Sequence, residues 1–182
     1  MGTCDPKHLA IVAESIEEQF CLPVKMGENL GAPAYALDPC RNQVNSNLIL
    51  KKLNEVAPHD AFKVLGITNH DLFSPIFSFV FGEAQFRGRC AVVSTYRLHE
   101  ERPAEKRVRY PSLVERLEKE SIHELGHTLG LRHCRDLSCV MCFSASLSAA
   151  DSKFPYFCPV CHDLVQWQLE MEMESQKRPD AT

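Results

Sequence analysis

The stretch His123-Glu-Leu-Gly-His-Thr-Leu-Gly-Leu-Arg-His133 decides how the rest of this 182-residue chain is interpreted. On an α-helix, His123 and His127 are separated by about 40° in angle and about 6 Å in rise, so their imidazoles point the same way. Two such side chains can bind one zinc ion. Glu124 lies about 100° round from His123, where its carboxylate is free to take a proton from water. The pattern therefore predicts a metal site on a helix, with Glu124 as a catalytic base.

The third histidine joins this site only if the helix ends before it. On a continued helix, His133 would lie about 15 Å beyond His123 and about 80° off its face. Gly130 stands where a break is needed, because glycine enters the left-handed conformation at a helix C-terminus without steric cost. We therefore expect the chain to turn back after Gly130. Three neutral nitrogen ligands with an open fourth position are typical of a catalytic zinc.

Upstream of this motif, helical and strand-like segments alternate. Apolar periodicity predicts a helix at 8–20 and a second one at 46–57, with Ser46 or Asn47 as its N-cap. The strand-like runs are 22–25, 62–68, 76–81 and 90–96. Such alternation favours an α/β fold with a largely parallel sheet whose faces are covered by helices.

Four further segments complete the expected organisation. Residues 82–88 are bounded by glycines and predict a turn or a twisted ribbon that joins two antiparallel neighbours, and the charged stretch 100–109 predicts a solvated loop. Ser112 and Glu115 form a capping box at the start of the long helix that carries the histidines. A closing helix is expected at 164–173.

Nine cysteines are present, and five of them fall between Cys134 and Cys161. An odd, clustered set indicates metal ligation in a reducing compartment rather than a disulfide framework. By spacing alone, Cys139-x-x-Cys142 and Cys158-x-x-Cys161 form two zinc knuckles and leave Cys134 free. The four remaining cysteines are widely spaced and are predicted to be free thiols in the core; they are Cys4, Cys21, Cys40 and Cys90.

The histidine motif, with Cys134 directly after its third histidine, resembles the metzincin clan of zinc metallopeptidases and, within it, the archaemetzincins of peptidase family M54. Met141, Cys158-Pro-Val-Cys161 and residues 79–84 extend the resemblance. It implies an α/β (α+β), metzincin-like zincin fold: a twisted, mainly parallel sheet with one antiparallel edge strand, a backing helix, an active-site helix and a small zinc-stapled C-terminal subdomain. It also implies that Met141 forms a hydrophobic floor under the histidines.

For the cysteines, the resemblance implies a different set from the spacing: Cys134, Cys139, Cys158 and Cys161, with Cys142 spare. We prefer this set, in which Cys134 ties the exit of the third histidine to the second ion. Four thiolates close the coordination shell, so this zinc would be structural. Two zinc ions per chain are thus predicted, one catalytic and one structural. His162 is another candidate ligand by position, but an exposed histidine is the simpler expectation.

The predicted activity is hydrolysis of peptide bonds, with Glu124 first as general base and then as general acid. Phe143 stands where some metzincins place a tyrosine, so oxyanion stabilisation would rest on zinc and backbone donors. The region 76–86 is a candidate edge strand for pairing with an extended peptide. Two alternatives remain: a zinc-ribbon binding or scaffold protein with little peptidase activity, and a hydrolase of a non-peptide amide.

Composition sets the remaining expectations. The chain is 45% hydrophobic and 24% charged with a net charge of −4, which is ordinary for a globular protein and argues against nucleic acid as a partner. No apolar run approaches about 20 residues, and no secretory signal precedes residue 10, so a cytoplasmic protein without a membrane partner is predicted. Its expected partner is a peptide or protein substrate. We expect one metallopeptidase domain over 1–182, with subdomains 1–130, ending in the active-site helix, and 131–182.

Overall fold

A computed structural model of the chain describes residues 4–99 and 111–176. The predicted loop at 100–109 lies outside these residues. The helices are α1 (Pro6–Phe20), α2 (Ser46–Val56), α3 (Leu113–Thr128), α4 (Leu147–Ser152) and α5 (Pro159–Gln176), with short 3-10 turns at Ala34–Ala36 and Arg97–His99. The strands are β1 (Leu37–Asp38), β2 (Gln43–Asn45), β3 (Val64–Thr68), β4 (Leu72–Ser74), β5 (Phe77–Val80), β6 (Gly82–Ala84) and β7 (Cys90–Ser94).

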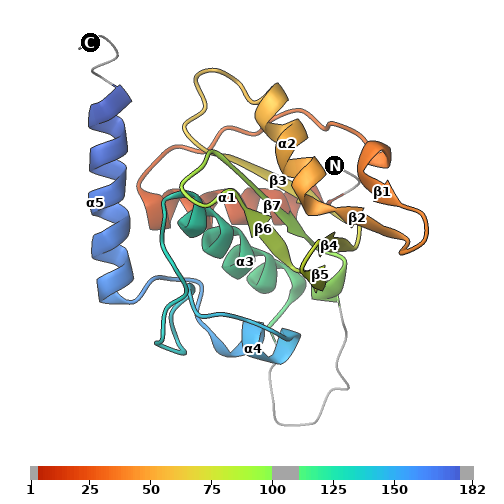
Figure 1. Cartoon of the computed structure of the whole chain (residues 1–182). Helices are drawn as coiled ribbons and strands as arrows, with labels where there is room; N and C mark the ends of the chain where they lie inside the picture. The colour runs from red at the N-terminus through yellow and green to blue at the C-terminus, as the bar shows by residue number, and fades with distance from the viewer. Residues whose placement is uncertain (1–3, 100–110, 177–182) are drawn as a thin grey trace.

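The strands form two small sheets (Figure 1). In the three-stranded sheet, β3 and β7 are parallel and β6 pairs with β7 antiparallel, in the order β3-β7-β6. In the four-stranded sheet, β2 and β4 are parallel, and β1 and β5 are antiparallel edges. The first sheet has the predicted arrangement of parallel strands with one antiparallel edge strand, whereas the second sheet was not predicted.

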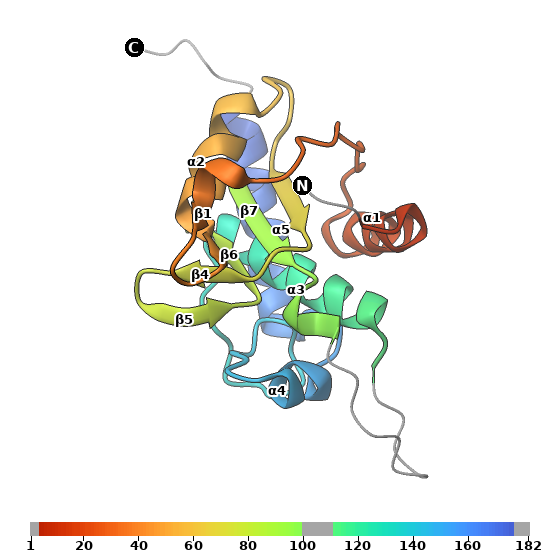
Figure 2. The same ribbon diagram turned by 90° about the vertical axis from the view of Figure 1, so that its right-hand side faces the viewer.

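Strand β7 is covered on both faces, which explains its continuous apolar sequence. All five of its residues are buried. Cys90 and Val92 pack in one core cluster with α2, and Val93 packs in another with Val12 of α1 and Leu117 of α3. The views in Figures 1 and 2 agree with this layering, with α2 on one side of the β3-β7-β6 sheet and α1 and α3 on the other. Helix α3 therefore packs on the face of the sheet formed by β7 and β6.

Several predicted elements are confirmed and others are corrected. Both early helices form, although Asn45 is the N-cap of α2, since its side chain accepts from Asn47 N and Leu48 N. No strand forms at 22–25: Pro23 has no backbone N–H, and Val24 N donates instead to the Glu17 carboxylate at 2.7 Å. Helix α5 starts earlier than predicted, and α4 was not predicted.

The prediction that all four dispersed cysteines are core thiols is wrong for two of them. All four are free, but only Cys90 is buried and Cys4 is half-buried. Cys21 is exposed because it caps α1 in the left-handed conformation. Cys40 is exposed in a turn, where its N–H donates to the Asp38 carboxylate at 2.9 Å.

None of the described helices is both long and apolar enough to cross a membrane.

Candidate active site

Helix α3 begins and ends at well-defined residues. Ser112 Oγ accepts from Glu115 N at 3.4 Å, and Glu115 Oε2 accepts from Ser112 N at 2.6 Å, which confirms the predicted capping box. At the other end Gly130 has a φ of 87°. Gly130 N donates to His127 O at 2.9 Å, and Leu131 N donates to Gly126 O at 3.1 Å. This pair of bonds defines a Schellman motif, which turns the chain back towards the helix.

The turn brings all three histidines together, as the sequence predicts. The nearest donor atoms of His123, His127 and His133 lie within 4.8 Å of one another. His123 is buried in the cleft floor, whereas His133 is exposed and its ring packs against Phe143 with centroids 4.9 Å apart. The group is therefore open to solvent on the side of His133.

The hydrogen bonds of two histidines fix their tautomers. His123 Nδ1 lies 2.8 Å from Val140 O, and His127 Nδ1 lies 2.7 Å from Leu131 O, so each Nδ1 carries the proton that it donates. Neither Nε2 then holds a proton, yet the two Nε2 atoms face each other at 3.1 Å. Two nitrogens about 2.05 Å from one tetrahedral zinc are separated by about 3.3 Å. The donor set thus fits a zinc ion. Burial also lowers the pKa of each of the three imidazoles, which favours the neutral, ligating form.

Glu124 is buried beside the three histidines, and its side chain packs against strand β6. A Cβ built on Gly82 would lie 2.6 Å from Glu124 Cγ and 2.9 Å from its Oε1, closer than side chains pack. Burial, with Glu120 as a second cause, raises the pKa of Glu124 well above its usual value, and Lys153 opposes this shift. Glu120 and Lys153 form a buried ion pair at 3.0 Å. Gly82 is therefore the residue that lets β6 approach the carboxylate.

A cleft of about 530 Å³ opens over the histidines and Glu124. Its walls come from the segment 76–84 on one side and from 143–145 on the other. Phe77 and Phe143 are about half exposed along it, whereas Phe81 is buried in the core. Aromatic side chains around a few converging polar groups are typical of a ligand-binding cleft.

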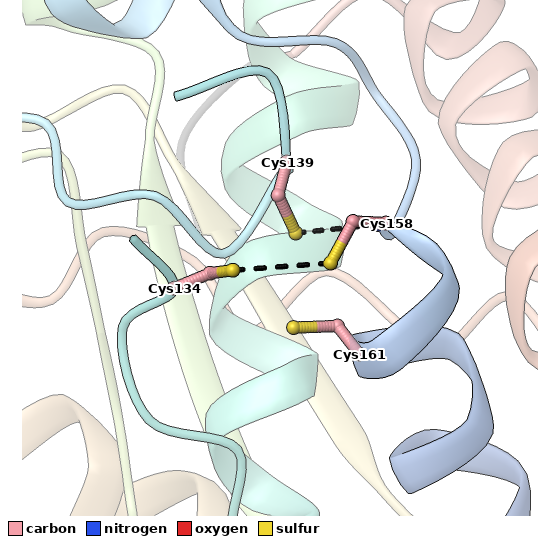
Figure 3. A group of neighbouring side chains, drawn as sticks. All are labelled: Cys134, Cys139, Cys158 and Cys161. Carbon is pink, nitrogen blue, oxygen red and sulfur yellow. Dashed lines mark hydrogen bonds between the residues drawn. The ribbon is translucent and has the colours of Figure 1, made fainter. Parts of the chain in front are cut away.

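Four cysteines form a second group, shown in Figure 3. The Sγ atoms of Cys134, Cys139, Cys158 and Cys161 lie within 4.8 Å of one another, and those of Cys134 and Cys158 are 3.8 Å apart. Two sulfurs about 2.3 Å from one tetrahedral zinc are separated by about 3.8 Å, so this set also fits the metal. Burial and the neighbouring Cys139 raise the pKa of the Cys161 thiol, whereas hydrogen bonds from the neighbouring cysteines lower the pKa of Cys158. Backbone N–H groups of Asp136 and Cys158 donate to the Cys134 and Cys139 sulfurs.

The geometry groups the cysteines as the family pattern implies and not as their spacing suggests. The Cys142 sulfur is outside the group and lies 3.8 Å from Phe143 O. His162 is also outside, half exposed, with its ring nitrogen 3.7 Å from the Asp163 carboxylate.

Met141 is fully buried and packs against α3. A Cβ on Gly126 would lie 2.5 Å from the Met141 sulfur, so a larger residue there would force the Met141 side chain to move. Gly126 stands one residue before His127, and the contact therefore lies on the helix turn between the buried His123 and the partly buried His127.

The match to known proteins agrees with this geometry. The sequence model of peptidase family M54 matches residues 10–167. The chain belongs to peptidase family M54. Among M54 relatives, the archaemetzincin of Methanopyrus kandleri is 42% identical over 139 residues, which cover 76% of this chain and 74% of that protein. The archaemetzincin of Thermococcus kodakarensis is 38% identical over 169 residues, with 88% and 89% covered.

Solved M54 structures are also similar. The crystal structure of the Methanopyrus kandleri archaemetzincin has a TM-score of 0.78 at 38% identity and covers 90% of this chain and 87% of its own. That of the Archaeoglobus fulgidus protein, complexed with malonate, has a TM-score of 0.73 at 32% identity and covers 90% and 99%. The predicted family and fold class are confirmed.

Sequence reasoning missed four residues of the site: Gly82, Gly126, Glu120 and Lys153. The two glycines carry a usable signal, because an isolated glycine inside a strand or helix often marks a close approach. Of the two alternatives for the segment 82–88, a turn or a twisted ribbon, residues 82–84 form a strand, β6, which pairs antiparallel with β7. The pair Glu120–Lys153 joins residues far apart in the chain, and neither position has a local pattern that marks it.

Proposed function

We propose that this M54 chain is a zinc-dependent metallopeptidase, with a catalytic zinc on His123, His127 and His133 and with Glu124 as general base. The observation that carries the proposal is the convergence of the two unprotonated Nε2 atoms at 3.1 Å in an open cleft. Their neighbour His133 supplies a third nitrogen and leaves a fourth position for water or substrate. A structurally similar protein of Methanocorpusculum labreanum, 28% identical with a TM-score of 0.71, is described as a zinc-dependent peptidase, which supports the assignment.

The chain's own residues then have distinct roles. Zinc held by three imidazoles supplies a Lewis acid that lowers the pKa of water and polarises a carbonyl group. Glu124 takes a proton from the attacking water and passes it to the departing amine. The Val140 and Leu131 carbonyls hold the imidazoles in orientation.

Strand β6 offers an edge to an extended peptide. Ser94 N donates to Phe81 O, and Gln85 N donates to Cys90 O, so the odd-numbered residues of β6 pair with β7. In an antiparallel ladder the alternate residues point their N–H and C=O groups the other way. Gly82 and Ala84 therefore face the cleft, and we propose that the substrate backbone pairs with them. Within the region 76–86, which the sequence predicts to pair with an extended peptide, we therefore propose β6 rather than β5 as the pairing strand.

We further propose that the four-cysteine group binds a structural zinc and that the chain acts as one domain. Cys134 and Cys139 follow the third histidine, and Cys158 and Cys161 start α5, so one ion would join both ends of the segment 134–161. This segment contains only one short helix. Its order is expected to depend on the ion.

Metal removal tests the proposed function directly. Purified protein is expected to cleave bonds in a mixed peptide library, to lose this activity on treatment with a chelator, and to regain it with stoichiometric zinc. Mass spectrometry of the library identifies the products. A zinc-loaded, folded protein that cleaves no peptide would contradict the proposal and favour the scaffold or the non-peptide amidase alternative.

The contact between Gly82 and Glu124 gives a second prediction. Gly82→Ala places a Cβ into Glu124 and within 2.8 Å of Val92 O, so either the carboxylate or the strand must move. We expect kcat/KM to fall about tenfold or more, because small misplacements of reacting groups are costly, while zinc content stays at the wild-type value.

Gly66→Ala is the matched control. Its Cβ would also be close to a neighbour, 2.7 Å from Leu53 Cδ1, but that atom is the end of a side chain in the core between α2 and β3. This variant is expected to lose stability without a specific loss of activity. A fully active, zinc-loaded Gly82→Ala protein would show that the close approach has no catalytic role.

A further inference from the structure

A second cavity, of about 370 Å³, lies directly beyond one end of the catalytic cleft. Phe86 lines both cavities, so this ring forms the boundary between them. The other walls come from the turn after β6, the chain after α3 and one face of α5; they include Arg87, Gly130, Arg132, Leu164 and Gln168. A peptide paired along β6 and continued past Ala84 would reach this cavity.

Arg87 and Arg132 both line the cavity, and among the residues that the structure describes no acidic one lines it. The Arg87 side chain lies over Gly130, since a Cβ there would be 2.8 Å from Arg87 Cγ and 2.9 Å from its Nε. Within residues 4–99 and 111–176, neither Arg87 nor Arg132 forms an ion pair with a carboxylate. The C-terminal end of α3 is the negative end of its helix dipole, which explains one nearby cation. It does not explain two arginines that line the same cavity.

The walls of the cavity are connected by partly buried hydrogen bonds. Lys63 Nζ donates to Gly88 O at 2.9 Å, to Thr128 O at 3.2 Å and to the Glu172 carboxylate at 2.7 Å. One ammonium thus joins the turn after β6, the end of α3 and α5. It also pairs with Glu172, one of the four acidic residues of α5. Arg87 N donates to His127 O at 3.1 Å, which connects the turn to the proposed metal site.

We propose that this cavity is an anion-binding subsite that takes a carboxylate of the bound peptide on Arg87 and Arg132. The planar guanidinium groups match a carboxylate with two parallel hydrogen bonds, and Gln168 can add an amide donor. The apolar rings and side chains of Phe86 and Leu164 suit the methylene groups of a glutamate. The proposal rests on the proposed function, because the ligand is a substrate bound along β6.

The test uses blocked peptides that share one cleavable sequence and differ at a single position. Glutamate and its uncharged isostere glutamine are placed in turn at each position on either side of the cleaved bond, and a free C-terminal carboxylate is compared with its amide. Wild-type protein is expected to prefer one glutamate position about fivefold or more in kcat/KM, a modest factor because both arginines are exposed. A preference for the free C-terminus instead would identify the terminal carboxylate as the ligand.

Arg132→Gln is expected to bring the glutamate-to-glutamine ratio at that position close to one, and Arg87→Gln to lower it similarly. Arg135→Gln is the matched control, because Arg135 is an exposed arginine of the same segment that does not line the cavity; it should keep the wild-type ratio. Equal constants for all peptide pairs in the wild type, or a ratio unchanged in Arg132→Gln, would overturn the subsite.

Binding measurements separate this proposal from the proposed function. Fluorescence anisotropy of the same labelled peptides, on zinc-loaded Glu124→Gln protein, reports affinity without cleavage. A glutamate preference that is lost in Glu124→Gln/Arg132→Gln supports the subsite even if the wild type cleaves none of the peptides. Equal affinities for each pair would refute the subsite, whatever the outcome of the cleavage assay.

Discussion

Glu124→Gln is expected to lower kcat/KM for peptide hydrolysis by about 100-fold or more, the usual range for a general base. Glutamine keeps the shape of the side chain that packs against Gly82, but its amide does not accept a proton from water. Glu124 is not among the grouped ligand side chains, so zinc content should remain that of the wild type. Steady-state kinetics measure kcat/KM, and metal analysis of the same preparation measures the zinc content.

Glu118→Gln is a suitable control for this variant. Glu118 lies on the same helix and, like Glu124, has a carboxyl pKa raised mainly by burial, but it is not part of the cleft lining. It is expected to retain wild-type kinetics. Full activity in a folded, zinc-loaded Glu124→Gln protein would remove Glu124 from the mechanism.

Cys158→Ser is expected to have the largest effect on stability. It removes a sulfur that lies 3.8 Å from Cys134 Sγ and leaves three thiols in a group that fits a four-coordinate ion. Zinc content should fall from about two ions per chain to one or fewer. Because structural zinc sites contribute folding free energy, Tm should fall by roughly 10 °C or more. Thermal melts followed by circular dichroism and metal analysis measure both changes.

Two variants separate this effect from general damage. Cys142→Ser changes a cysteine of the same segment whose sulfur is outside the group, and it should retain both zinc ions. His127→Ala should lose about one zinc with a smaller shift in Tm, since α3 remains packed through Leu117, Ile122 and Leu125. A wild-type protein with one zinc, or a Cys158→Ser protein that melts like its parent, would contradict the two-zinc assignment.

The local signals in the sequence predicted the grouping of the three histidines because each signal acts over a few residues. The spacing of His123 and His127 is a property of any helix, and Gly130 shows the left-handed conformation that its position requires. The capping box at Ser112 likewise depends only on four consecutive residues. For the cysteines, spacing within the chain suggested the wrong partners. A knuckle at Cys139 and Cys142 is compatible with local geometry, but the fold directs Cys142 away and places Cys134 beside Cys158.

The rest depends on contacts between distant segments, which local patterns do not encode. Strands β1, β2 and β4 have two or three residues each, too few for a period to be recognised. Their pairing, such as Val44 with Leu72, joins separate parts of the chain. The need for a small residue at position 82 is visible only in the folded structure, where Glu124 packs against Gly82. The burial of the Lys153 charge is explained only by its ion pair with Glu120, which lies on α3.

The segment 139–141 touches both proposed metal centres with three consecutive residues. Cys139 belongs to the cysteine group, the Val140 carbonyl accepts from His123, and Met141 packs against Gly126. Under the proposed metal assignment, the two centres are therefore linked, because an ion that orders residues 139–141 also positions the carbonyl that accepts from His123. Loss of the cysteine ion is then expected to weaken zinc binding at the histidines, and the coupling is reciprocal.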